Sequence, residues 1–164
     1  MKKLIALLLL ILPLTAMAQD VKIAFVDRNV VLQAMPEFAT FQKQMQEFNE
    51  KLGAELKQMQ DEFQKKSADY IAAQDSLTEN IKLRRMQELQ DMQARIENFM
   101  QIAQQDSEKK QSELFEPIQK KLMDAIKAVG AEKGFTYILD PQIIMYTGSN
   151  AIDATPMVKT KLGI

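Results

Sequence analysis

The side chains best suited to chemistry in this chain are its carboxylates, because the sequence has 22 Asp and Glu residues but no histidine and no cysteine. The commonest general base and metal ligand is therefore missing, and calcium binding would need the carboxylates in a dense local cluster. They recur instead beside Lys and Arg, as on solvated helix surfaces. Neither a glycine-rich phosphate loop nor a Gly-x-Ser-x-Gly motif is present. The sequence therefore predicts no enzyme activity, no metal site and no cofactor.

The methionines are the second group with a distinctive chemistry, since a flexible thioether suits contacts with varied apolar partners. Those in the central part of the chain are Met45, Met59, Met86, Met92 and Met100. One interpretation is that they fill the space between two packed helices, and the other is that they contact a binding partner. Met92, Phe99 and Ile102 lie off the main apolar stripe described below, so we predict that these three contact a partner.

These side chains belong to a segment of eighty residues, 37–116, that contains no proline and a single glycine, Gly53. Its first half has apolar residues three or four positions apart, as in the narrow seam of a coiled-coil helix. The residues of this stripe are Phe38, Phe41, Met45, Phe48, Leu52, Leu56, Met59, Phe63 and Tyr70. The pattern predicts one long helix.

The second half of the segment carries another stripe. Its residues are Leu77, Ile81, Met86, Leu89, Gln93, Ile96, Met100 and Ala103. Between the stripes, Ser76 to Glu79 matches a capping box, which indicates the start of a helix. We therefore predict an antiparallel helical hairpin with its tip near 73–76, a single uninterrupted helix being the alternative. The stripe thins from Ala103 to Ser112, which predicts a flexible segment.

The flanking segments predict a small body made of strands and short helices. Apolar, β-branched runs indicate strands at 21–26, 135–139 and 143–147, and short helices are expected at 28–34 and 157–162. Pro117 is expected to bend or restart the returning helix, and Gly134 to end it. The fold class is mainly α with a small β part (α+β), in which the coiled-coil arm 37–116 is inserted into a body formed by 19–36 and 117–164.

Such a small body is marginally stable alone, and its short strands leave exposed edges. We therefore predict that the chain forms oligomers through the body, although the sequence itself does not fix the number of subunits. The strand residues expected to mediate oligomerisation are Ile23, Phe25, Val26, Tyr137, Ile138, Leu139, Ile144 and Tyr146.

Residues 1–18 have the features of a cleavable signal peptide. Lys2 and Lys3 precede the apolar run 4–14, and Ala16-Met17-Ala18 fits the small-x-small rule for cleavage. We predict cleavage after Ala18 and export across a bacterial inner membrane, an uncleaved anchor being the alternative.

The charge of the remaining chain bears on its partners. Without the two leading lysines, 19 basic residues face 22 acidic ones, a net charge of −3. Nucleic acid is therefore not expected as a partner. Basic pairs such as Lys65-Lys66 and Arg84-Arg85 allow weak contact with a membrane surface, but their acidic neighbours favour an ordinary solubilising surface.

Two groups of residues resemble the signatures of the Skp/OmpH family of periplasmic outer-membrane-protein chaperones. The N-terminal group is 22–27 (KIAFVD) with Val31-Leu32 and Met35-Pro36-Glu37. The C-terminal group is 134–140 (GFTYILD) with Met145-Tyr146 and Asp153-Ala154-Thr155. The best-known members are strongly basic, whereas this chain is mildly acidic.

The resemblance implies an ATP-independent holdase of the periplasm. In that family three subunits join through the body, and three hairpin arms surround a cavity that holds unfolded outer-membrane β-barrel proteins before membrane insertion. Met92, Phe99 and Ile102 would then contact such clients. The alternative function is that of a structural or adaptor coiled-coil protein of the cell envelope, which would bind one specific folded partner.

Overall fold

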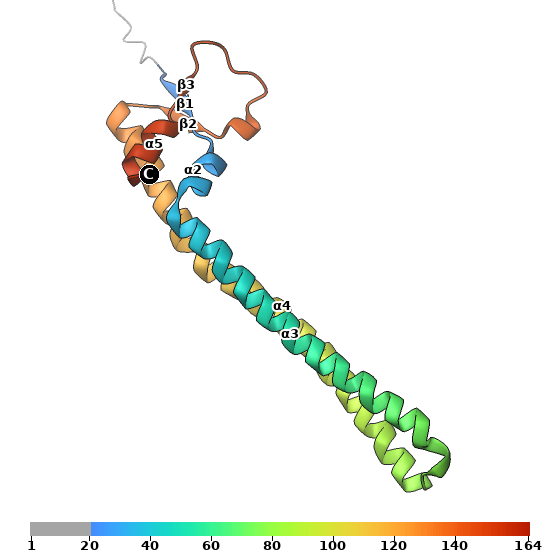
Figure 1. Cartoon of the computed structure of the whole chain (residues 1–164). Helices are drawn as coiled ribbons and strands as arrows, with labels where there is room; N and C mark the ends of the chain where they lie inside the picture. The colour runs from blue at the N-terminus through green and yellow to red at the C-terminus, as the bar shows by residue number, and fades with distance from the viewer. Residues whose placement is uncertain (1–20) are drawn as a thin grey trace, which may run out of the picture.

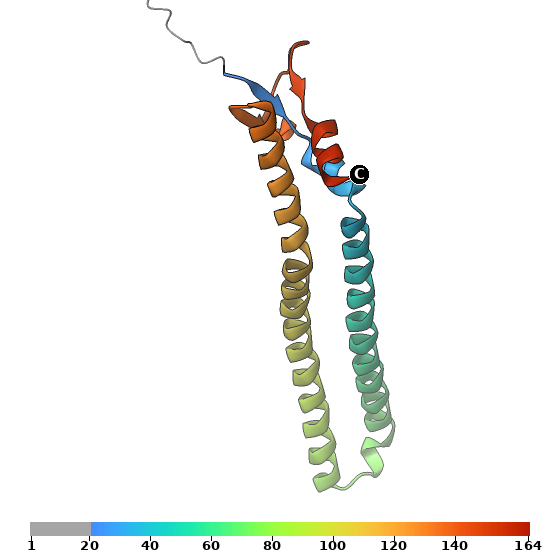
Figure 2. The same cartoon turned by 90° about the vertical axis from the view of Figure 1, so that its left-hand side faces the viewer.

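A small body and a long helical hairpin that projects from it make up the computed structural model of the protein (Figure 1, Figure 2). The structure describes residues 21–164, so the predicted signal peptide and its cleavage position lie outside the described residues. The elements are β1 (Ile23–Phe25), α2 (Arg28–Ala34), α3 (Pro36–Ala73), η1 (Gln74–Ser76), α4 (Glu79–Lys133), β2 (Tyr137–Leu139), η2 (Pro141–Ile143), β3 (Ile152–Asp153) and α5 (Thr155–Leu162). The predicted fold class is confirmed.

The described strands form one parallel sheet in the order β2-β1-β3. Ala24 at its centre lies opposite Ile138 of β2 and Ile152 of β3. Parallel neighbours cannot be joined by a tight turn and need a long crossover connection. The connection between β1 and β2 contains α2, α3, η1 and α4, and thus the whole arm. The arm is therefore an insertion between two neighbouring strands.

The body has a compact apolar core in which β1, α2 and α5 pack against the last turns of α4. Its buried side chains are Ala24, Val26, Val31, Met35, Ile118, Leu122, Ala125, Val129, Ala154 and Val158. In α4 the buried positions recur at steps of three or four, which places them on one face of the helix. The returning helix therefore serves both parts of the molecule, since one end completes the body core and the rest forms the arm.

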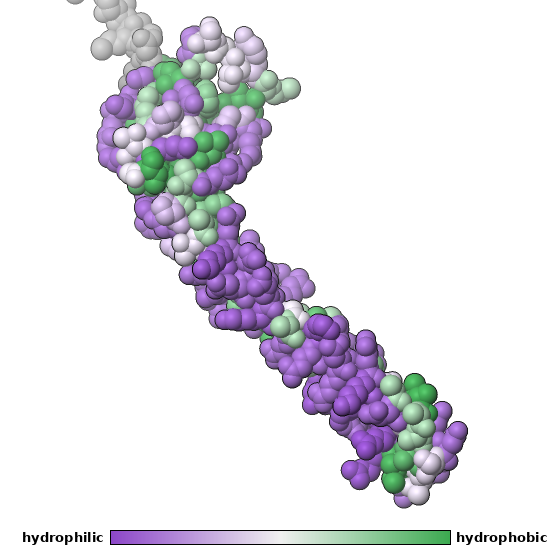
Figure 3. All heavy atoms as spheres, viewed as in Figure 1, coloured by the Kyte–Doolittle hydropathy of each residue, from purple (hydrophilic) through white to green (hydrophobic). Residues whose placement is uncertain are grey.

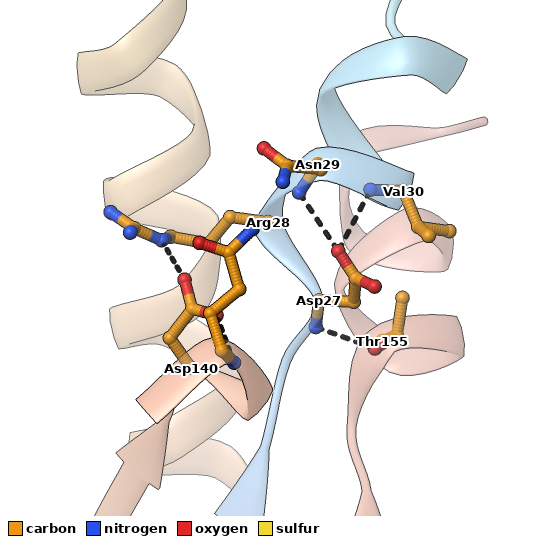
Figure 4. Close-up of polar contacts among 7 residues, drawn as sticks. Asp27, Arg28, Asn29, Val30, Asp140 and Thr155 are labelled. Carbon is orange, nitrogen blue, oxygen red and sulfur yellow. Dashed lines mark hydrogen bonds and ion pairs between the residues drawn. The ribbon is translucent and has the colours of Figure 1, made fainter. Parts of the chain in front are cut away.

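Asp27 connects the first strand to the first helix and to the C-terminal segment (Figure 4). Its side chain caps α2 by accepting hydrogen bonds from the backbone N–H groups of Asn29 and Val30, at 3.0 and 3.1 Å. Its own N–H donates to Thr155 Oγ1 at 3.0 Å. The side chain of Arg28 pairs with Asp140 at 2.5 Å. These polar contacts fix the start of α2 relative to Asp140, which follows β2, and to Thr155, at the start of α5.

The third strand lies further along the chain than the sequence predicts, so the assignment of 143–147 is wrong. The Asp140 side chain accepts a hydrogen bond from the N–H of Gln142 at 2.9 Å, and Pro141 starts the turn η2. The chain then continues without regular structure, and Ile144 and Tyr146 belong to this loop. Only Ile152–Asp153 pairs with β1. Asp140-Pro141 thus directs the chain away from the sheet edge before it returns.

Of the two effects predicted for Pro117, a bend or a restart of the returning helix, the restart does not occur. Pro117 lies inside α4, which continues to Lys133 and is capped by Gly134 in the left-handed conformation with φ of 65°. Proline removes the hydrogen bond to the carbonyl group of Glu113, four residues earlier, and normally weakens a helix. The apolar face that starts at Ile118 is buried against the body and stabilises the helix at this position.

Candidate functional site on the arm

The two helices of the arm meet along a narrow seam of half-buried side chains. On α3 this seam consists of the apolar stripe predicted from the sequence, from Phe38 to Tyr70. None of the 38 residues of α3 is fully buried, because each helix has only one neighbour. A two-helix seam therefore protects its residues less than the core of the body does.

The seam of α4 agrees with the predicted stripe at Leu77, Leu89, Ile96 and Ala103 but differs from it elsewhere. Met92 is only 6% exposed and is the one fully buried apolar residue of the described arm, and Phe99 is half-buried. Met86, Gln93 and Met100, which the prediction placed in the seam, are exposed. The prediction that Met92 and Phe99 lie off the stripe is therefore wrong, and neither presents a fully exposed side chain to a client. Ile102, the third candidate, is 46% exposed.

An aromatic cluster joins the arm to the body. Phe38, Phe41 and Phe115 lie with ring centroids 5.5 to 6.4 Å apart. Beside them, Lys121 pairs with Glu37, and this hydrogen bond lowers the pKa of the Glu37 carboxyl. A mainly apolar cavity of about 330 Å³ lies at the same level, lined in part by Phe41 and Ile118. The root of the arm therefore combines an aromatic cluster, an ion pair and an apolar cavity.

Polar residues interrupt the seam in the segment where the sequence predicts flexibility. Ser107 donates a hydrogen bond across the arm to Asn49 Oδ1 at 3.0 Å, and Lys110 is half-buried further toward the body. These side chains take positions that apolar residues occupy elsewhere in the seam. Weaker apolar packing favours local opening, so the flexibility of this segment stays a prediction with a structural basis.

The chain reverses direction in η1, but without the predicted capping box. Thr78 precedes α4 and makes no side-chain capping bond, and the Ser76 hydroxyl donates instead to the carbonyl of Ala73 at 2.8 Å. Across the arm from this turn, Lys66 of α3 pairs with Glu88 of α4. Hydrogen bonds from Lys66 and then Arg85 lower the pKa of Glu88. An ion pair therefore links the two helices near the tip, where the seam contains fewer apolar residues.

Several large apolar side chains near the tip are exposed, and they form what we call the tip patch. It consists of Ile71, Ile81, Leu83 and Met86, which range from 41% exposed (Ile81) to 69% (Leu83). Figure 3 shows apolar residues gathered at this end of the arm, while the shaft is mostly hydrophilic on the face in view. Sequence reasoning missed Ile71 and Leu83 because neither belongs to a repeating stripe. Their position beside the turn, where the partner helix ends, was the signal that could have found them.

The body also presents apolar side chains to solvent. Ile23 and Tyr137 on the paired strands are exposed, as are Ile143, Met145 and Tyr146 of the following loop. The remaining predicted oligomerisation residues are less accessible: Phe25, Ile138, Leu139 and Ile144 are half-buried, and Val26 is 1% exposed. Val26 lies just beyond β1 with its side chain in the core of its own subunit, so it is not a surface residue.

Two further properties concern the part of the chain that the structure describes. Within residues 21–164, no helix combines the length and the apolar character needed to cross a membrane. Across this same range, no group of three or more acidic residues is arranged so that it could hold a metal ion. The described arm presents separate exposed apolar side chains on a long charged surface.

Comparisons with known proteins agree with this architecture. A family model described as outer membrane protein (OmpH-like) matches residues 22–162. A chaperone protein Skp from Pectobacterium atrosepticum is 30% identical over 137 residues, covering 82% of this chain and 81% of the relative. A second Skp, from Yersinia enterocolitica, is 25% identical and covers 84% of each chain.

The fold also has a counterpart among solved structures. The crystal structure of an OmpH-like outer membrane chaperone from Caulobacter crescentus superposes with a TM-score of 0.74 and covers 85% of this chain and 82% of the other. The two sequences are 14% identical, so this likeness concerns the fold.

Proposed function

The chain belongs to the OmpH-like family, and from that premise we propose that it is an ATP-independent holdase chaperone that binds unfolded outer-membrane proteins and prevents their aggregation before membrane insertion. The observation that carries the proposal is the arm, which presents separate exposed apolar residues on a long charged surface. Isolated apolar contacts of this kind bind weakly one by one but add up over a long, flexible client.

Release of the client needs no nucleotide in this proposal. Each contact is weak, so a client leaves by breaking contacts in succession once a stronger acceptor competes for it. Histidine and cysteine, two of the commonest catalytic side chains, are both missing from the chain. We therefore assign the protein a binding role with no chemical step.

Assembly through the body completes the proposal, with three subunits as in the resemblance described above. The exposed side chains of Ile23, Tyr137 and Tyr146, together with the neighbouring Ile143 and Met145, supply an apolar surface that supports such contact. The body core is small, which also favours oligomerisation. Three arms extending from one assembled body would surround a client and multiply the weak contacts.

We place this function in the periplasm, after removal of residues 1–18 by cleavage behind Ala18. Skp proteins and OmpH-like chaperones are what the chain is similar to, and the apolar run after Lys2 and Lys3 supports export. N-terminal sequencing of the protein recovered from the periplasm would test the cleavage position. We expect Gln19 as the N-terminal residue.

The deciding experiment is suppression of aggregation. Purified mature protein is mixed with an unfolded outer-membrane β-barrel protein, without nucleotide, and aggregation is followed by light scattering. We expect suppression near stoichiometric amounts and a complex whose mass in solution contains three subunits. Absence of suppression at several-fold excess would contradict the proposal, and capture of a single folded partner instead would favour an envelope adaptor.

A further inference from the structure

The exposed apolar residues Met100 and Ile102 lie in a part of the arm with an unusual charge. We define the middle of the arm as residues 47–62 of α3 and 91–108 of α4. Cross-arm contacts fix this pairing, since Ser107 bonds to Asn49 at one end and Lys66 pairs with Glu88 just past the other. Met100 and Ile102 are two positions apart on α4, so they point to opposite flanks of the seam.

The middle of the arm carries all of the net negative charge of residues 19–164. It contains nine acidic and three basic residues, a net charge of −6. The rest of the arm, 37–46, 63–90 and 109–116, has seven acidic and eight basic residues, a net charge of +1. The body, 19–36 and 117–164, has six acidic and eight basic residues, a net charge of +2. The small negative net charge of the chain therefore comes from one segment, the middle of the arm, which is strongly negative.

Ion pairing does not neutralise this stretch. Lys57 pairs with Asp61 at 2.8 Å inside it, whereas Glu55, Glu97 and Asp106 are exposed and form no ion pair within residues 21–164. Glutamines satisfy several of the carboxylates, as Gln93 does for Glu97 at 3.1 Å, but they leave the charge in place. The excess is spread over about 25 Å of helix, so a bound chain of opposite charge would meet it along its length.

We propose that the middle of the arm is a docking surface for unfolded segments that combine apolar residues with lysine or arginine. This inference rests on the proposed holdase function and specifies the class of client segment. Met100 and Ile102 would contact the apolar side chains on the two flanks, and the surrounding carboxylates would attract the cationic ones. Residues 63–90, which include the tip patch, carry five basic and four acidic residues and are nearly neutral, so this end of the arm would not discriminate by charge.

The test uses the full mature protein and two labelled, unstructured peptides with identical apolar residues. One peptide carries lysines and the other carries glutamates at the same positions, and binding is followed by fluorescence anisotropy. At low salt we expect the lysine peptide to bind about tenfold more tightly than the glutamate peptide. The difference should shrink as salt screens the exposed charges.

A matched pair of variants separates local charge from net charge. The first variant, Glu55→Gln, Glu97→Gln and Asp106→Asn, halves the net charge of the middle. The control, Asp69→Asn, Asp75→Asn and Glu116→Gln, changes the charge of the whole chain equally but outside the middle. The first should lose most of the preference for the lysine peptide, whereas the control should keep it.

The possible outcomes distinguish this inference from the function on which it rests. Equal binding of both peptides, or equal loss in both variants, overturns the docking surface, even where the protein still suppresses aggregation of an unfolded β-barrel. Failure to bind either peptide and to suppress aggregation overturns the proposed function as well. Preserved folding of both variants, checked by circular dichroism, ensures that a loss of binding reflects charge.

Discussion

The body and the arm of this molecule are stabilised in different ways. Ten of the eleven fully buried apolar residues in the described chain belong to the body core, which includes the last turns of α4. The arm contributes Met92 alone, and the rest of its seam is half-buried. A part with a closed core resists opening, whereas a long two-helix seam can open locally. The difference supports the proposal that the body mediates assembly and that the arm provides adaptable binding.

The largest effect is expected in the body, from Leu122→Ala. Leu122 is 3% exposed and lies where α4 enters the body core. Removing its buried side chain should lower the free energy of unfolding by about 2–5 kcal/mol. Denaturation by urea measures the loss. The neighbouring, partly exposed Met123 supplies the control, since Met123→Ala should change stability by less than about 0.5 kcal/mol. Similar losses in both variants would contradict the assignment of the core.

An intermediate effect is expected in the arm, from Met92→Ala. The side chain is buried in a seam with only two helices, so we expect a loss of about 1–3 kcal/mol, toward the lower part of the range for core methionines. Hydrogen exchange should accelerate in the arm and stay unchanged in the body. Met100→Ala is the control, and exchange that accelerates equally in both variants would show that the seam runs through Met100, as the sequence first indicated.

A smaller effect is expected from acidification, which acts on ion pairs of the arm. Hydrogen bonds from Lys121 and from Lys66 lower the pKa of Glu37 and of Glu88, respectively. The stabilisation is complete above the ordinary carboxyl pKa of about 4.3 and is lost as the pH falls through the lowered folded values. Both pairs are partly exposed to solvent, so salt should weaken the effect.

The melting temperature, measured from neutral pH down to pH values below the ordinary carboxyl pKa, reports this pH dependence of stability. Glu37→Gln should lower the melting temperature at neutral pH and make the decline on acidification shallower than in the unchanged protein. An identical decline in both proteins would show that the pair at the root contributes nothing. The same comparison with Glu88→Gln reports on the tip.

The smallest effect on stability is expected at the exposed apolar residues, combined with a clear effect on binding. Leu83→Ser and Ile102→Ser should each change the free energy of unfolding by less than about 0.5 kcal/mol, because both side chains are exposed. The double variant should hold unfolded β-barrel proteins less well in the aggregation assay. Gln90→Ser and Gln101→Ser are matched exposed controls, and a loss of holding in these would contradict a specific role of the apolar residues.

The sequence predicted the arm well where a single periodic stripe was decisive. From Phe38 to Tyr70 the predicted seam is the observed one. The aromatic and aliphatic residues of α3 lie along a single face of the helix, so only one face can form the seam. On α4 the predicted and the observed seams share Leu89, Ile96 and Ala103, and the prediction is wrong at Met86, Gln93 and Met100. The predicted seam requires the polar Gln93, whereas the observed one connects the shared residues through the apolar Met92 and Phe99 at steps of three and four.

Other features depended on tertiary contacts that a local pattern does not contain. The apolar run 143–147 has the composition of a strand, but Asp140 and Pro141 turn the chain away before it can pair. Pro117 normally ends a helix, but the face beginning at Ile118 is buried against the body and α4 continues. Ile71 and Leu83 of the exposed tip patch belong to no periodic stripe, so only the position of the turn reveals them.

Hydrogen exchange of the mature protein, with and without a bound unfolded outer-membrane β-barrel protein, tests the division between body and arm most directly. We predict that the client changes exchange along the arm, from the tip patch around Leu83 to Ile102, and leaves the body core around Leu122 and Val129 unchanged. Changes confined to the body, with an arm that exchanges identically in both states, would contradict the account.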